Sequence, residues 1–246
     1  MGGRGARRLG AGPRPCHGAP HVGMNASVKT AHAQAMEQIV REIAPTLKAV
    51  GFQKSRHRFN RDVESGMVHA VSFQMGPFEP PGTEEIPPFR MDMYGKCTVN
   101  LGVFVPEMVI DPSNGPKGWV NEYDCQLRQR LGHLLTAGSS DVWWSLANPE
   151  AAATDVGSVL DEYGLTWLGR LTTRSELLAA YRTDGGTALG MTPRAPVEIA
   201  WLLAHSDRPA AESVLREYLD GEMHASHREW LTEMLAANGY GHLVGR

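Results

Sequence analysis

Several features are scarce in this sequence of 246 residues, and each scarcity excludes a class of protein. There are three cysteines, too few for a disulfide framework, and such usage is typical of a reducing cytosol. Hydrophobic residues make up 42% of the chain, enough for a buried core, but no apolar run is long enough to span a bilayer. We therefore expect a cytoplasmic protein that does not enter membranes.

An excess of charge of one sign is missing as well. The formal net charge is −3, and the lysines and arginines are spread along the chain, which argues against nucleic acid as a partner and against adsorption to a membrane. Residues 1–23 are rich in Gly, Arg and Pro and lack the apolar segment of a secretory signal. We expect this tail to be disordered, because its apolar surface cannot offset the entropy of ordering. The alternative is a basic arm that contacts phosphates. It is the weaker interpretation, because the arginines of the tail are few and separated by other residues.

Motifs for cofactor or covalent chemistry are also absent. There is no P-loop, no dinucleotide fingerprint and no nucleophile elbow, so we expect no cofactor. His224 and His227 have the spacing of a metal half-site, but they lack a third ligand, and we interpret them as a surface pair with no metal. His69 is expected to be a hydrogen-bonded core histidine. Cys97 and Cys125 are expected to be small buried hydrophobes.

The clearest structural signal is a strand over residues 96–105. Cys97, Val99, Leu101, Val103 and Val105 fall on one side of its pleat, and Thr98, Asn100, Gly102 and Phe104 fall on the other. Neither side is purely polar, so the pattern predicts a central strand that is covered on both faces. A glycine inside a strand costs stability unless another backbone or a ligand approaches it closely.

The segment before this strand predicts a helix and a hairpin. Ser27 or Thr30 can cap a helix that runs toward Val50. Residues 52–61 are interpreted as a basic edge strand, which pairs across a short turn with a strand over residues 67–75. A long proline-rich loop then leads to the central strand, and loops of that length are usually functional or mobile.

After the central strand the pattern becomes increasingly helical. Residues 123–131 fit either a strand that turns at Gly132 or a helix, and we favour the strand. A helix from Pro149 is expected to end at Gly164, and another begins at a cap formed by Thr173 or Ser175. The predicted fold is α+β, with an antiparallel sheet of about four strands covered by helices. The expected divisions are a domain at 24–182, a linker at 183–192 and a three-helix C-terminal appendage at 193–246.

A series of short segments follows a recognisable order. They are Gly51-Phe52, the basic residues through Arg61, Ser72-Phe73-Gln74, Thr98-Val99-Asn100-Leu101-Gly102, Asp124-Cys125 with Arg128 and Arg130, and Trp143-Trp144. Together they resemble the bacterial family of domains of unknown function numbered 4304, over residues 30–182. The resemblance implies the fold of that family and no mechanism, because the family carries no established activity.

A polar cluster is the candidate binding site. Its members are Arg56, Arg58, Arg61, Asn100, Arg128 and Arg130, bordered by Trp143 and Trp144. Arginine forks bind phosphate or carboxylate with two hydrogen bonds, and indole rings offer flat surfaces for stacking. These groups converge if the first and fourth strands share an exposed face. Otherwise the arginines form a solvated strand face and the tryptophans belong to the core.

We expect this surface to bind a protein or a small anionic ligand without catalysis, and we assign no catalytic residue. A rival hypothesis is a hydrolase or transferase that uses Asp124 or Glu122 in a cleft closed by the proline-rich loop. Ion pairing of these carboxylates with Arg128 or Arg130 is the simpler interpretation. A third hypothesis, by analogy alone, is an immunity-like protein that masks the active site of a toxin.

Overall fold

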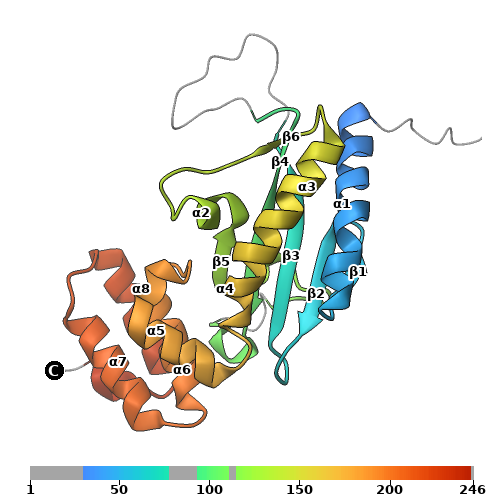
Figure 1. Ribbon diagram of the computed structural model, residues 1–246. Coiled ribbons are helices and arrows are strands. Elements are labelled where there is room, and N and C mark those ends of the chain that lie inside the picture. The colour runs from blue at the N-terminus through green and yellow to red at the C-terminus, as the bar shows by residue number, and fades with distance from the viewer. Residues whose placement is uncertain (1–29, 78–92, 111–114, 245–246) are drawn as a thin grey trace, which may run out of the picture.

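A computed structural model describes residues 30–77, 93–110 and 115–244. Helices cover one face of an antiparallel sheet, and the C-terminal helices gather beside one edge of that sheet (Figure 1). This architecture is the predicted α+β class. The expectations for the N-terminal tail and for the proline-rich loop concern residues outside the described ranges.

The strand predicted to be central is central. The strands are β1 (Gln53–Ser55), β2 (Arg58–Asp62), β3 (Val68–Met75), β4 (Lys96–Phe104), β5 (Leu127–Arg130) and β6 (Trp144–Ser145). They are arranged in the order β1-β2-β3-β4-β5, and β6 pairs with the start of β4. Because β4 is hydrogen-bonded to β3 on one side and to β5 and β6 on the other, it holds the sheet together.

The edge strand predicted over residues 52–61 is instead a tight hairpin of β1 and β2. Ser55 pairs with Arg58, so only two residues form the turn. Arg56 adopts a φ of 55° in that turn, a left-handed conformation that glycine or asparagine usually provides. Within the described residues, this hairpin and the short β6 bring the sheet to six strands, where about four were expected.

Two helices pack side by side across one face of the sheet, α1 (Ala31–Ala49) and α3 (Pro149–Val159) (Figure 1). The Thr30 hydroxyl caps α1 by accepting a hydrogen bond from the Ala33 amide at 3.2 Å, and Gly51 follows the helix with a φ of 93°. Both boundaries of this helix agree with the sequence pattern.

The helix predicted to end at Gly164 continues. From α3 the chain passes through a π-helical turn (Leu160–Gly164) into α4 (Leu165–Gly169). A Cβ atom on Gly164 would lie 2.8 Å from the Leu160 Cδ1 atom and 3.1 Å from that of Leu131. The glycine therefore permits close packing against neighbouring side chains and does not end the helix.

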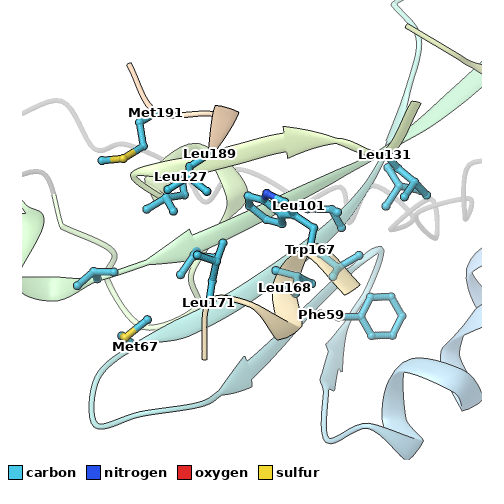
Figure 2. Packing of buried hydrophobic residues seen from close by; sticks show 14 of the residues in the cluster. Phe59, Met67, Leu101, Leu127, Leu131, Trp167, Leu168, Leu171, Leu189 and Met191 are labelled. Carbon is cyan, nitrogen blue, oxygen red and sulfur yellow. The ribbon is translucent and has the colours of Figure 1, made fainter. Parts of the chain in front are cut away.

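The main core lies between these helices and the sheet. Cys97, Val99, Leu101 and Val103 of β4 are fully buried there, and Figure 2 shows part of the cluster around Leu101. The opposite face of the sheet has a second, smaller apolar cluster of Ala70, Phe104, Val120 and Cys125. Both faces of β4 are thus covered, as its sequence predicted.

His69 is a core histidine with two partners, as expected. Its Nδ1 lies 3.0 Å from an Arg61 nitrogen, and its Nε2 lies 2.8 Å from the Leu171 carbonyl oxygen. Burial lowers the pKa of His69 to about 4, with a smaller contribution from the positive charge of Arg61.

Residues 127–135 form a strand followed by a short helix, the two alternatives considered for this part of the chain. The favoured strand is present as β5, but the expected turn at Gly132 is the short helix α2 (Leu131–Leu135). The following chain passes very close to this glycine, because a Cβ there would lie 2.4 Å from the Val142 carbonyl oxygen.

The C-terminal helices are attached to the edge of β5. They are α5 (Arg174–Ala188), α6 (Ala195–Ala204), α7 (Arg208–Asp220) and α8 (Ala225–Ala237). The Arg128 amide donates a hydrogen bond to the Gly190 carbonyl at 3.2 Å, and the Gln129 side chain donates to the Ala188 carbonyl at the same distance. This contact covers a strand edge that would otherwise expose unpaired backbone groups.

The segment predicted as a linker, residues 183–192, is helical through Ala188 with a break at Gly185. The pair Gly185-Gly186 suggested flexibility, but a Cβ on Gly186 would lie 2.7 Å from that of Ala195. The glycine therefore lets α5 approach α6 closely. One continuous set of buried residues extends from α1 into α8. The division into a domain and an appendage stays a prediction.

Candidate functional site

Four polar residues form one row across the face of the sheet opposite α1. The strand register pairs Arg58 with Ser72, Ser72 with Asn100, and Asn100 with Arg130. Residues opposite one another in a sheet point to the same side, so the row crosses β2, β3, β4 and β5 on one face. Arg128 lies two residues from Arg130 and shares that face. The arginines were expected to converge if the outer strands shared one face of the sheet. Arg58, Arg128 and Arg130 do lie on one face.

Arg130 is held in place by its neighbours. Its Nε donates to the Asn100 Oδ1 at 3.3 Å, and a terminal nitrogen forms an ion pair with Asp141. The guanidinium lies 5.3 Å from the centre of the Trp143 ring, and the Trp143 indole donates to the same Asp141 at 2.8 Å. Asn100 in turn donates to Gln74 at 2.8 Å. These contacts fix the position of one charge on the face.

A short 3₁₀ helix, η3 (Glu122–Asp124), lies across the middle of this face. The Ser72 hydroxyl donates to Glu122 at 2.7 Å. Gly102 lets the segment approach the sheet, because a Cβ there would lie 2.6 Å from the Cys125 Sγ. The Asp124 carboxylate accepts hydrogen bonds from the Asn121 backbone at 2.8 Å and side chain at 2.9 Å.

These contacts correct one expectation. Ion pairs of Glu122 or Asp124 with Arg128 or Arg130 were predicted from their proximity in sequence. In the described part of the chain, Arg130 pairs with Asp141, Glu122 holds η3 on the sheet through Ser72, and Asp124 closes the turn onto Asn121. Arg58 donates to the Asn121 side chain from the other end of the row, so it also contacts this segment.

Tyr123 is the middle residue of η3, and 64% of its surface is exposed. On one side of it is a groove of about 860 Å³, lined by Arg41 of α1 and by Lys54, Arg56 and Arg58 of the first hairpin. On the other side is a smaller groove of about 340 Å³, which Asn100, Arg128 and Arg130 line. We call Arg56, Arg58, Asn100, Tyr123, Arg128 and Arg130 the polar face.

Arg61 does not belong to the polar face. It lies an odd number of residues from Arg58 on the same strand, so it points to the opposite side. There its guanidinium donates to the Val50 carbonyl at 3.1 Å and lies 5.0 Å from the centre of the Phe52 ring. Burial lowers the pKa of Arg61.

The two tryptophans are separated. Trp144 is only 7% exposed, pairs with Cys97 in the sheet and belongs to the main core. Trp143 is half-buried beneath Arg130. The exposed aromatic side chain of the polar face is therefore Tyr123, which the sequence analysis missed although it lies between two acidic residues in a polar segment.

The buried cysteines fit the expected role. Burial raises the pKa of Cys97 to about 11 and that of Cys125 well above its usual value, so both thiols stay protonated. His224 caps α8, while the Nε2 of His227 lies 2.8 Å from the Tyr218 hydroxyl. Among the described residues, no group of three or more His, Cys, Asp or Glu side chains could hold a metal ion.

The comparisons with known proteins agree with the sequence pattern. Residues 88–170 match the family model described as "Domain of unknown function (DUF4304)". This part of the chain, 83 of the 246 residues, is similar to that family. The predicted resemblance to this family is thereby confirmed, over a shorter segment than the 30–182 expected.

The matched segment contains β4, η3, β5 and Trp143, while the first hairpin precedes it. No curated protein and no solved structure matches the chain. Within the described ranges, none of the helices has both the length and the hydrophobicity needed to cross a membrane.

Proposed function

We propose that this protein is a bacterial, cytoplasmic, non-catalytic module that binds an acidic segment of a partner protein along its polar face. The observation that supports this most strongly is the exposed ring of Tyr123, which stands between two grooves lined by arginines. Tyrosine and arginine are the residues that most often dominate the binding energy of protein interfaces, because they combine large contact area with hydrogen bonding.

The charge of the larger groove favours an acidic partner. Among the described residues, four arginine and lysine side chains line it, against two glutamates. One of the glutamates, Glu122, already accepts a hydrogen bond from Ser72. The whole chain carries a net charge of −3, so attraction of an acidic partner has to come from local charges such as those of this groove.

The length of the polar face suits an extended segment. Arg58 and Arg130 lie three strand spacings apart, which is roughly 15 Å at about 4.8 Å per strand. That span accommodates about four to five residues of extended chain. A single small anion would occupy only one end of the row.

The enzyme hypothesis receives less support from these contacts. Asp124 uses one carboxylate oxygen to cap Asn121, and Glu122 is bonded to Ser72. Both carboxylates thus have a structural partner. An immunity-like protein remains a special case of the proposed function, in which the acidic partner is a toxin.

The test is affinity capture from the source organism with quantitative mass spectrometry. We expect a partner that the wild-type protein retains at about 0.1 M salt and releases at about 0.5 M. A variant with Arg56→Ala, Arg58→Ala and Tyr123→Ala should retain at least about tenfold less of it. Lys48→Ala with Arg182→Ala removes two exposed charges away from the polar face and should retain as much as wild type.

Two outcomes of this experiment contradict the proposal. One is a partner that the triple variant captures as well as the wild type does. The other is a protein that captures no partner but binds inorganic phosphate or citrate with an affinity that falls in the triple variant. That result would assign the polar face to a small anion.

A further inference from the structure

A third pocket lies where the sheet meets the C-terminal helices. Its volume is about 500 Å³, within the range of small-molecule sites. Phe104, Met108 and Val109 form an apolar wall, while Arg128 and Glu198 come from β5 and α6. The pocket therefore combines a hydrophobic surface with charges of both signs.

Glu198 is the unusual residue of this pocket. Only 8% of its surface is exposed, and its Oε2 atom has no hydrogen-bond partner among the described residues. Burial raises its pKa to about 7, although Arg194 and Arg128 attract the ionised form. A buried carboxyl group without a partner is costly, so its presence at a pocket calls for a ligand that supplies the missing donor.

Arg194 also lines the pocket, and an aromatic stack holds it there. Its guanidinium carbon lies 4.8 Å from the centre of the Trp230 ring, and Trp230 stacks on His227 with ring centres 5.3 Å apart. His227 in turn lies 2.8 Å from the Tyr218 hydroxyl. Among the described residues, no ion pair joins Arg194 to Glu198 or to another carboxylate, so its hydrogen-bond donors are available to a ligand in the pocket that Arg194 lines.

A ligand that satisfies these groups needs two charges. A carboxylate would accept paired hydrogen bonds from Arg128 and Arg194, and an ammonium group would donate to Glu198. An apolar side chain would pack on the wall formed by Phe104 and Val109. A simple anion would leave Glu198 without a donor, and a simple amine would leave both arginines unpaired.

We propose that this pocket binds a free α-amino acid with an apolar side chain, its carboxylate held by Arg128 and Arg194 and its ammonium group by Glu198. The proposal does not depend on capture of a protein partner. Arg128 also belongs to the polar face, but Glu198 and Arg194 lie outside it, so variants of these two residues test the pocket separately.

The first measurement is isothermal titration calorimetry on the full chain with L-leucine and L-phenylalanine. We then compare L-phenylalanine with 3-phenylpropanoate, which lacks the ammonium group, and with phenethylamine, which lacks the carboxylate. Each analogue leaves one part of the pocket unsatisfied, so we expect each to bind at least about tenfold more weakly than the amino acid. An analogue that binds as tightly as L-phenylalanine would overturn the proposal.

Two variants test which protein residue binds each charged group of the amino acid. Glu198→Gln should weaken amino-acid binding at least about tenfold and leave the affinity for 3-phenylpropanoate unchanged, whereas Arg194→Met should weaken both. Glu229→Gln, on the exposed surface of α8, is the matched control and should change neither. Melting curves check that each variant is folded.

Either of two results would refute the amino-acid site. One is the absence of binding by both L-leucine and L-phenylalanine up to millimolar concentrations, and the other is equal affinity in wild type and Glu198→Gln. Partner capture through the polar face should persist in Glu198→Gln, so failure of this proposal and failure of the proposed function give different results.

Discussion

The buried carboxyl group of Glu198 destabilises the folded state at neutral pH, and the same group is the proposed ligand of an ammonium ion. The side chain lies in an otherwise apolar helix and is buried beside two arginines that it does not contact in an ion pair. Groups of this kind are usually eliminated unless they have a function, because an apolar or amide residue of similar size would be more stable.

The first prediction concerns how protonation of Glu198 changes the stability of the protein with pH. Its pKa rises from the ordinary 4.5 to about 7 in the folded protein, so the folded state binds the proton more tightly than the unfolded state. The stability from this group is complete below pH 4.5 and is lost as the pH rises through 7. Glu198→Gln should therefore match wild type at pH 4.5 and exceed its unfolding free energy by about 3 kcal/mol at pH 8.5.

Urea denaturation of wild type and Glu198→Gln at the two pH values measures this difference. Glu229→Gln is again the control, since an exposed glutamate should show no such effect. A Glu198→Gln variant that is less stable than wild type at pH 8.5 would mean that the carboxylate has a stabilising partner.

The second prediction concerns His69, whose pKa is lowered to about 4 mainly by burial. The folded state binds this proton less tightly than the unfolded state, so the associated stability is present above pH 6.5 and is lost as the pH falls toward 4. The loss amounts to about 3 kcal/mol. In NMR spectra, the imidazole of His69 should not titrate between pH 5.5 and 8, and a midpoint near 6.5 would contradict its burial.

For single residues, the sequence indicates which side of a strand or helix a side chain lies on, but not which residues it contacts. The separation of Arg58 and Arg61 already places them on opposite sides of a strand, so the misplacement of Arg61 was avoidable. Glu198 could be noticed as a lone charge in an apolar helix, APVEIAWLLA. Its burial near Arg128 depends on how α6 packs against the 3₁₀ helix at Pro106–Met108, which no local pattern contains.

Among the elements, β4 follows its sequence most closely. Alternating apolar residues predicted a central strand, and Gly102 marks the place where η3 crosses it. The cap and apolar stripe of α1 were equally clear. The first hairpin was missed because its turn contains Arg56 in a left-handed conformation and no glycine. The continuation of α3 into α4 was missed because Gly164 resembles a helix end.

The third prediction compares two glycines. Gly102→Ala places a methyl group 2.6 Å from the Cys125 Sγ and should lower the unfolding free energy by about 1–3 kcal/mol. Gly157→Ala, in the middle of α3, meets no atom within 4 Å and should raise it by about 0.5–1 kcal/mol. Chemical denaturation measures both values. A neutral Gly102→Ala would show that η3 does not press against the strand.

Over the whole molecule, the core does not stop at the expected domain boundary. The same buried cluster includes Leu127 of β5, Leu189 and Met191 after α5, and Leu231 of α8 (Figure 2 shows the first three). The sequence predicted all three C-terminal helices, but not their attachment to the sheet edge. The hydrogen bond between Gly190 and the edge strand is a tertiary contact, which the local sequence does not reveal. The pair Gly185-Gly186 pointed the other way, because two adjacent glycines more often form a flexible connection.

The fourth prediction is that the chain unfolds in one cooperative step. Removal of residues 193–246 would expose Met191 and Leu189, which are almost fully buried. We expect the truncated chain to lose most of its stability or to aggregate, while the full chain shows coincident transitions by circular dichroism and tryptophan fluorescence. A truncated chain with the stability of the full one would instead support an independent appendage after the linker.

The central claim, that the polar face binds an acidic partner, has one most direct test. A photoreactive p-benzoylphenylalanine is placed at position 123 on η3, or at position 150 on α3, which covers the opposite face of the sheet, and each protein is irradiated in lysate of the source organism. We predict a cross-linked acidic protein from position 123 alone, with a yield that falls as salt rises. Cross-links of equal yield from both positions, or from position 150 alone, would contradict the account.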